Sequence, residues 1–329
     1  MSTRPAEIRK IKPHRVKKTF YETIEPWLFL LPALCVFGVF LYFPFFKTLY
    51  LSTFLTNKFG QAKIFYGLKN YADILYGKYS REFWNSIWVT VRFVFFVAGG
   101  GLLVGLCTSL ITVNKFPGKA LASAIYAMPI AIASSAAAMS FKMILHKSIG
   151  LLNHLLGTSI NWLSDTTWTF PIICILSIWL ASGINFIFIG AGLRNIPEEL
   201  YESCRIDGGN ELRAFFSIAL PLSKPIIAVI ALYAAVGQWN GYFNALIYTN
   251  KPALQPLQLV LRNVLILNQS FSVADAVDAE EMAYMARRAY MVQTMKYALV
   301  FVASAPIMCA YPFVQKYFVK GVMLGSVKG

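Results

Sequence analysis

The sequence has little charge for its length. Only 14% of its 329 residues are Asp, Glu, Lys or Arg, whereas soluble globular domains carry roughly one quarter. Hydrophobic residues make up 57%, more than a chain of this length can enclose in one water-soluble core. The composition excludes a soluble domain and a disordered chain, and it predicts that much of the apolar surface faces lipid.

Motifs for catalysis and nucleotide binding are also missing. The three histidines lack the H-E-x-x-H spacing, and the G-x-S-x-G nucleophile motif is absent. No G-x-x-x-x-G-K-[ST] loop is present to cradle ATP phosphates. The five cysteines stand singly, so they form neither a disulfide framework nor a metal set. We therefore expect no catalytic residues, no metal, no cofactor and no enzymatic activity in this chain.

Six uncharged stretches are each long enough to cross a bilayer, because a hydrocarbon core of about 30 Å needs roughly 20 residues of helix. They are Trp27–Phe46, Phe93–Val113, Ala120–Phe141, Thr166–Leu193, Pro225–Asn250 and Tyr297–Gln315. The prediction is an all-α polytopic membrane protein with six transmembrane helices. It comprises a basic leader at 1–26, a membrane domain at 27–315 and a tail at 316–329.

Basic residues indicate the orientation. An excess of Lys and Arg marks the cytoplasmic side of a membrane protein, and the leader alone contributes Arg4, Arg9, Lys10, Lys12, Arg15, Lys17 and Lys18. With six spans, both termini are then predicted to be cytoplasmic. The net charge of +15 is thus an orientation signal and not a sign of nucleic-acid binding. We expect Trp162 and Trp168, beside the second outer loop, to lie at the lipid interface.

The cytoplasmic link between the fourth and fifth predicted spans reads as two short amphipathic helices. Pro197 is suited to the first position of the first helix, followed by two glutamates that favour the helix dipole. Gly208–Gly209 interrupts the pattern and Asn210 is a cap for the second helix. Pro221 and Pro225 are expected to end that helix before the next span. Leu200, Cys204 and Tyr201 are predicted to form the apolar side of the first helix, and Leu212, Phe215, Phe216 and Ile218 that of the second.

Fixed spacing adds to this amphipathic pattern. Glu202 is followed by the small residues Ser203 and Cys204, then Gly208 after three more positions, and Ile218-x-Leu220-Pro221 after a further nine. This resembles the E-A-A…G…I-x-L-P signature of the permease subunit of bacterial binding-protein-dependent ATP-binding cassette importers. The alternative, an amphipathic helix lying on lipid, explains the apolar residues but not the spacing.

The resemblance implies a type I importer permease fold in the bacterial inner membrane. It implies a second permease subunit, two ATPase subunits and an extracytoplasmic solute-binding protein as partners. The loop 194–224 would couple the membrane domain to the ATPases, as a helix docked in a groove. The coupling residues implied are Glu198, Glu202, Ser203, Cys204, Asp207, Gly208, Ile218, Leu220 and Pro221.

Further resemblance indicates the carbohydrate-uptake branch. Residues 67–71, 83–86, 150–153 and 161–163 resemble the maltose-type first permease, whereas residues 239–245, 255–262 and 311–329 resemble the other, complex-polysaccharide type. The cargo implied is a sugar or oligosaccharide, with glycerol phosphate left open. Because such importers normally pair two different permeases, the mixture leaves a hybrid chain or a homodimer as open hypotheses.

The fifth predicted span holds amide and aromatic side chains suited to a sugar, which offers hydroxyls and apolar C–H faces. The candidates for the substrate path are Gln238, Trp239, Asn240, Tyr242, Phe243 and Asn244. Asn240 and Asn244 are expected one turn apart on one helix face. Alternatively, the amides join helices by hydrogen bonds.

An ion-coupled secondary transporter of a neutral solute is the alternative function, disfavoured by the uncharged spans; a membrane enzyme or scaffold fits less well.

Overall fold

The computed structural model describes most of the chain. The described residues are 20–56, 60–77, 80–113, 116–165, 167–249, 251–266 and 296–309, with 311, 312 and 315. The chain divides into two compact units, Met1–Tyr50 and Leu51–Gly329, and each is considered by itself. Most of the predicted leader and the whole of the predicted tail lie outside the described residues.

The first unit is a nearly continuous apolar helix. It comprises α1 (Phe20–Phe37), the π-helical turn η1 (Gly38–Tyr42) and α2 (Phe43–Ser52), which runs on into the second unit. From Ile24 to Ser52 it has the length and composition of a membrane span. Large apolar side chains such as Phe29 and Phe40 are more than three-quarters exposed within the chain, as expected of a helix that meets lipid.

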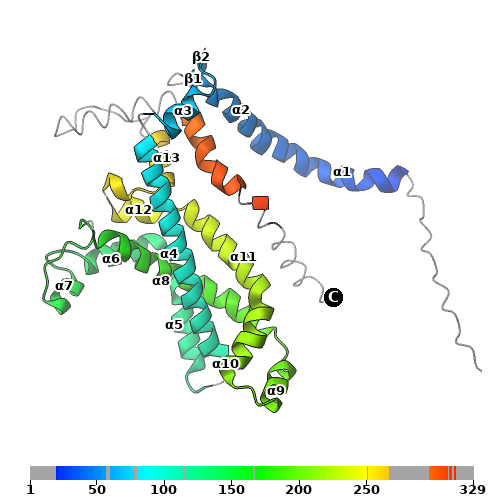
Figure 1. Ribbon diagram of the computed structural model, residues 1–329, viewed down its shortest axis with the longest axis vertical. Coiled ribbons are helices and arrows are strands. Elements are labelled where there is room, and N and C mark those ends of the chain that lie inside the picture. The colour runs from blue at the N-terminus through cyan, green and yellow to red at the C-terminus, as the bar shows by residue number, and fades with distance from the viewer. Residues whose placement is uncertain are drawn as a thin grey trace, which may run out of the picture. The chain divides into compact units, whose positions relative to one another are not determined.

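The second unit is built around two long helices, α4 (Ser80–Val113) and α8 (Thr169–Arg194), which pack along each other (Figure 1). Glycines allow this close approach, because a Cβ atom at Gly105 would lie only 2.6 Å from the Cβ of Asn185. The Ser109 hydroxyl donates a hydrogen bond across the interface to the Phe186 carbonyl at 2.9 Å. Small residues thus bring the helices together, and a hydroxyl joins them.

The third predicted span is sharply bent and not straight. It consists of α5 (Lys119–Ala131) and α6 (Ser134–Ile144), which meet at 99°. Pro129 lies in the last turn of α5, where the ring removes a backbone hydrogen bond and disfavours a straight helix. The stretch Ala120–Phe141 is thus two helices, separated by the extended backbone of Ile132 and Ala133, and whether the pair crosses the membrane once stays a prediction.

The fifth predicted span is displaced toward the N-terminus. A continuous helical run from Glu211 to Trp239 comprises α10 (Glu211–Ala214), the π-helical turn η2 (Phe215–Ala219) and α11 (Leu220–Trp239). The expectation that Pro221 and Pro225 end the second short helix is wrong. The Leu220 N–H bonds to the Phe215 carbonyl, five residues back, so the backbone is already in the wider π turn when Pro221 follows without a donor.

The other helices and strands are shorter. Antiparallel strands β1 (Phe54–Thr56) and β2 (Ala62–Phe65) form a hairpin with Phe54 opposite Phe65, followed by α3 (Lys69–Leu75). The remaining elements are α7 (Leu151–Leu156), α9 (Glu198–Ile206), α12 (Phe243–Tyr248), the 3-10 helix η3 (Pro252–Leu254), α13 (Leu257–Ile266) and an apolar helix at Lys296–Cys309. The last of these packs Ala298, Leu299 and Ala303 against Leu257 and Leu261 of α13.

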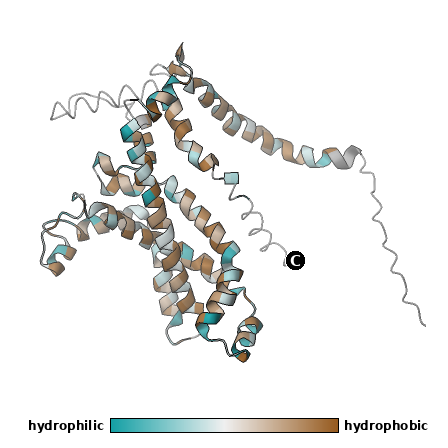
Figure 2. Ribbon diagram, viewed as in Figure 1, coloured by the Kyte–Doolittle hydropathy of each residue, from teal (hydrophilic) through white to brown (hydrophobic). Residues whose placement is uncertain are grey.

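The described residues contain four helices that qualify as membrane spans, and the bent α5–α6 pair provides a fifth. Their apolar surfaces are apparent in Figure 2. The helix at Lys296–Cys309, within the predicted sixth span, is apolar but shorter than the others. The polytopic all-α class is confirmed, while the number six stays a prediction.

Trp162 does not lie at an interface with lipid. It is 6% exposed and its Nε1 donates to Asn153 Oδ1 at 2.8 Å. The Asn153 amide nitrogen in turn donates to the Ile160 carbonyl at 2.8 Å, so one buried side chain organises this loop. The expectation for Trp162 is therefore wrong, whereas Trp168 is 44% exposed.

Candidate functional site

The coupling segment, residues 194–224, begins with α9. Pro197 is the residue before the helix and not its first residue, with an extended ψ of 137°, and Glu198 and Glu199 occupy the first turn. Acidic side chains there interact favourably with the partial positive charge of the helix N-terminus. The local sequence thus accounts for where α9 starts.

Two glycines make the turn after α9. Gly208 has a φ of +75°, the left-handed conformation that suits glycine at the end of a helix. At Gly209 a Cβ atom would lie 2.4 Å from Cys204 Sγ, so this position has no room for a side chain. Asn210 then caps α10, its Oδ1 accepting from the Arg213 N–H at 2.9 Å, which confirms the predicted cap.

One side of α9 is attached to the long helices. Tyr201 packs with Ile196 and Phe215 around the buried Leu193 of α8. Burial raises the pKa of the Tyr201 hydroxyl above its usual value. Cys204 is also half-buried.

Several residues of this segment face outward. Leu200, one turn before Cys204 in α9, is 41% exposed, so the predicted apolar side of the first helix is only partly covered by the described part of the chain. Within the second helix, Phe215 and Ile218 are half-buried while Leu212 and Phe216 are exposed, so these four residues are not buried together. The π turn at Phe215–Ala219 changes the angular spacing of side chains, which explains this difference.

The predicted coupling residues fall into two groups. Glu198, Glu202, Ser203, Asp207 and Gly208 are exposed in and directly after α9. The half-buried ones are Cys204 within α9 and Ile218, Leu220 and Pro221 where the segment joins α11. The first group includes three of the segment's carboxylates. An Arg205–Glu211 ion pair at 2.9 Å crosses the turn with both side chains mostly exposed, so it adds little stability.

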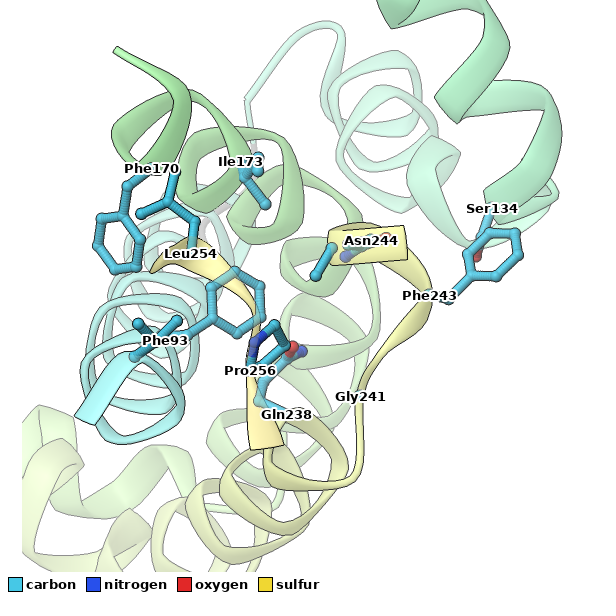
Figure 3. A pocket seen from close by; sticks show the side chains of 12 residues that line it. Phe93, Ser134, Phe170, Ile173, Gln238, Gly241, Phe243, Asn244, Leu254 and Pro256 are labelled. Atoms are coloured by element: carbon cyan, nitrogen blue, oxygen red, sulfur yellow. The ribbon is translucent and has the colours of Figure 1, made fainter. Parts of the chain in front are cut away.

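At the other end of α11, a cavity of about 130 Å³ opens where the helix stops. Three aromatic rings line it, from Phe93 of α4, Phe170 of α8 and Phe243 of α12 (Figure 3). Its polar wall residues are Ser134, Gln238 and Asn244. The remaining wall residues are Val89, Ile173, Gly241, Ala245, Leu254 and Pro256.

The predicted substrate-path residues separate at this cavity. Gln238, Phe243 and Asn244 line it, whereas Trp239, Asn240 and Tyr242 are not among its wall residues. Because α11 ends at Trp239 and α12 begins at Phe243, Asn240 and Asn244 do not share one helix face, and that prediction is wrong. The Asn240 side chain instead donates to the Val236 carbonyl at 3.0 Å.

The two cavity amides are placed differently. Asn244 Nδ2 donates to Ser177 Oγ of α8 at 2.8 Å, as the helix-joining alternative expected. Gln238 has no side-chain hydrogen-bond partner among the described residues. Its amide therefore has both a donor and an acceptor available for a bound molecule.

Non-helical backbone directly after an apolar span also favours a binding site here. Next to lipid, such backbone is tolerated where it is buried in protein or lines a cavity. Gly241, in the break between α11 and α12, is a wall residue of the cavity. Phe93, Phe170 and Leu254 were missed by the sequence analysis, because their contribution depends on how four separate segments come together.

Comparisons with known proteins agree with this arrangement. Residues 100–323 match the family described as binding-protein-dependent transport system inner membrane component. The polygalacturonan/rhamnogalacturonan transport system permease protein YtcP of Bacillus subtilis is 43% identical over 45% of this chain, and the chain spans half of that relative's length. The trehalose/maltose transport system permease protein MalF of Thermococcus litoralis is 34% identical, over 67% of this chain and 75% of its own.

A solved structure shares the fold. A chain of a bacterial alginate ABC transporter, in complex with alginate pentasaccharide-bound periplasmic protein, aligns with a TM-score of 0.69 and 18% identity. The alignment covers 90% of this chain and 95% of that one. At this identity the likeness establishes the fold, which is that of an importer permease.

Proposed function

This chain belongs to the family of inner membrane components of binding-protein-dependent transport systems, and we propose that it is the permease subunit of an ATP-driven importer of a sugar or oligosaccharide. The family is a membrane component, so the chain is a multi-pass transport protein and not an enzyme. The observation that carries the proposal is that an outward-facing coupling segment and a cavity lie at opposite ends of α11. Figure 1 shows α9 beyond one end of this helix and α12 beyond the other.

The coupling segment would transmit the work of ATP hydrolysis. Its α9 has no fully buried residue, and Ile206 at its end is 86% exposed, so an apolar side chain is available to a partner. Glu198, Glu202 and Asp207 surround it with negative charge. We propose that two ATPase subunits serve the importer, and that one receives this helix in a groove. We propose that this segment is cytoplasmic and that, with six spans, both termini are cytoplasmic as well.

The saccharide cargo is supported by the cavity and by the names of the relatives. Aromatic rings beside a free amide suit a ligand with apolar C–H faces and hydroxyls. The relatives are named for polygalacturonan/rhamnogalacturonan and for trehalose/maltose transport. We propose that a solute-binding protein delivers the saccharide and that a second permease subunit completes the path.

The test is substrate-stimulated ATP hydrolysis in proteoliposomes that contain the whole importer. Saccharide-loaded binding protein should raise the rate, and Glu202→Lys should abolish this stimulation while the complex stays assembled. A matched control is Lys142→Gln, an exposed charge on α6 away from the coupling segment. A rate that no saccharide changes would contradict the proposal.

The same preparation identifies the second permease. The mixture of maltose-type and polysaccharide-type stretches predicts either a hybrid chain with its own partner or a homodimer. Mass spectrometry of the purified complex counts the distinct permease chains. Two unlike chains would exclude the homodimer.

A further inference from the structure

Two arginine side chains stack on aromatic rings near the cavity, one on a wall residue and one on a residue next to the wall. The Arg92 guanidinium carbon lies 4.5 Å from the ring centroid of Phe170, a wall residue. The Arg262 guanidinium carbon lies 5.5 Å from the ring centroid of Tyr242, which sits between the wall residues Gly241 and Phe243. One cation therefore comes from α4 and the other from α13, on separate segments of the cavity surroundings.

Neither arginine is neutralised by the described part of the chain. The ion pair in that part is Arg205–Glu211, in the coupling segment, and none of the twelve wall residues is ionisable. The face of an aromatic ring attracts a guanidinium group, but the ring has no oxygen or nitrogen that accepts a conventional hydrogen bond from the guanidinium N–H groups. Arg92 and Arg262 thus keep N–H donors for another acceptor.

Placing these charges beside apolar helices is costly, and ionisable residues at membrane depth often mark a cargo path. Arg92 stands directly before Phe93, where the uncharged stretch of α4 begins. Because the wall itself carries no charge, the guanidinium groups of Arg92 and Arg262 contribute positive potential beside its aromatic residues. Low-dielectric surroundings strengthen this potential, which attracts an anion and repels a cation.

We infer that the cavity takes a negatively charged saccharide, whose carboxylate or phosphate oxygens are held by Arg92 and Arg262. This rests on the proposed function and narrows the cargo from any saccharide to an acidic one. The planar guanidinium offers paired N–H donors that match either oxyanion. The aromatic rings and the Gln238 amide hold the sugar rings and hydroxyls, so charge and shape are recognised by different residues.

The test measures binding to the assembled complex in nanodiscs, without the solute-binding protein, so that the cavity alone selects. The probes are trigalacturonate for a carboxylate, glucose 6-phosphate for a phosphate and maltotriose as the neutral saccharide. One acidic probe should bind at least roughly tenfold more tightly than maltotriose, in line with hydrogen bonds to charged groups. Added salt should weaken that preference.

Variants assign the preference to the two arginines. Arg92→Gln and Arg262→Gln should each lower affinity for the acidic probe roughly tenfold and leave maltotriose binding unchanged. Arg92→Lys keeps the positive charge but loses the paired N–H donors of the guanidinium group, so it should retain part of the preference for the acidic probe. Lys142→Gln removes a cation from α6 and should change nothing. Size-exclusion profiles show that each variant still assembles.

The inference is overturned if maltotriose binds as tightly as both acidic probes, or if the preference survives both glutamine variants. The second result would assign Arg92 to lipid headgroups. The proposed function has a separate readout, because saccharide-stimulated ATP hydrolysis requires only a delivered cargo. Stimulation by a neutral saccharide with no acidic preference defeats this inference alone, whereas no stimulation by any saccharide defeats the proposed function.

Discussion

The two ends of α11 differ in whether the helix continues or stops, and proline does not account for the difference. At the coupling end the helix runs through Pro221 and Pro225, whereas at the cavity end it stops at Asn240, where no proline occurs. Pro221 directly follows the π turn η2, whereas Pro225 lies inside α11 and lacks a backbone donor there. At the cavity end, Gly241 lines the hollow that the missing turn leaves open. We propose that the continuous end transmits movement from the coupling segment and that the interrupted end provides room for a ligand.

The same device appears in the first unit. The η1 turn is closed by the Phe43 N–H bonding to the Gly38 carbonyl, and Pro44 follows, just as η2 precedes Pro221. A wider turn directly before proline lets an apolar helix continue where the ring would otherwise displace the carbonyl four residues back. These prolines are therefore compatible with long membrane helices in this protein.

The largest effect on ATP hydrolysis should come from a bulky side chain in the turn that follows α9. Gly209→Val should reduce saccharide-stimulated ATP hydrolysis at least roughly tenfold, because its side chain would collide with Cys204 and shift α9 by overpacking. Cargo binding at the distant cavity should not change. The matched control is Gly237→Ala in α11, where a Cβ atom meets nothing within 4 Å. Equal losses in both variants would show that the turn has no special role.

The second-largest effect should come from weakening the packing of α9 against the long helices. Tyr201→Ala should destabilise the coupling segment by about 1–2 kcal/mol, because a half-buried ring no longer packs against the buried cluster that includes Leu193. Hydrogen exchange of the α9 amides measures this local stability. Tyr201→Phe preserves the ring and should behave like the unchanged protein. Unaltered exchange in Tyr201→Ala would show that the segment is held by its caps alone.

At the cavity end, two neighbouring amides should respond differently. Gln238→Ala should weaken saccharide binding roughly three- to tenfold, since it removes one free amide from the wall. Asn240→Ala should leave affinity unchanged, because Asn240 bonds to the Val236 carbonyl outside the wall. Titration of the assembled complex with the transported saccharide compares them. A larger loss of saccharide affinity in Asn240→Ala than in Gln238→Ala would contradict this assignment and support the predicted helix face shared by Asn240 and Asn244.

The smallest effect concerns pH at the loop that leads into α8. The backbone N–H of Thr167 donates to Asp165 Oδ1 at 2.7 Å, and this bond lowers the pKa of the carboxyl below its usual value of 3.8. The stabilisation is therefore complete above about pH 3.8 and is lost as pH falls through the lowered value. Exchange protection of the Thr167 amide, corrected for intrinsic rates, should follow this course and be insensitive to pH in Asp165→Asn. Protection that rises on acidification would contradict it.

The coupling segment was predictable in its caps and less so in its packing. Pro197, Gly208 and Asn210 act through backbone groups within a few residues, so their positions in the sequence suffice. Leu200 and Tyr201 are adjacent and both apolar in part, and which of them meets α8 depends on how α9 docks. The π turn at Phe215–Ala219 likewise changed which side chains of the second helix share a face.

The sequence by itself determined the membrane class, the family resemblance and the position of the coupling segment, because each follows from composition or from short-range spacing. Only the tertiary structure decided the rest. The bend after Pro129, the burial of Trp162 and the cavity beyond Trp239 depend on contacts between residues far apart in the chain. Arg92, isolated at the start of an apolar stretch in the sequence, becomes one of two charges beside the cavity only when α4, α8 and α13 meet there.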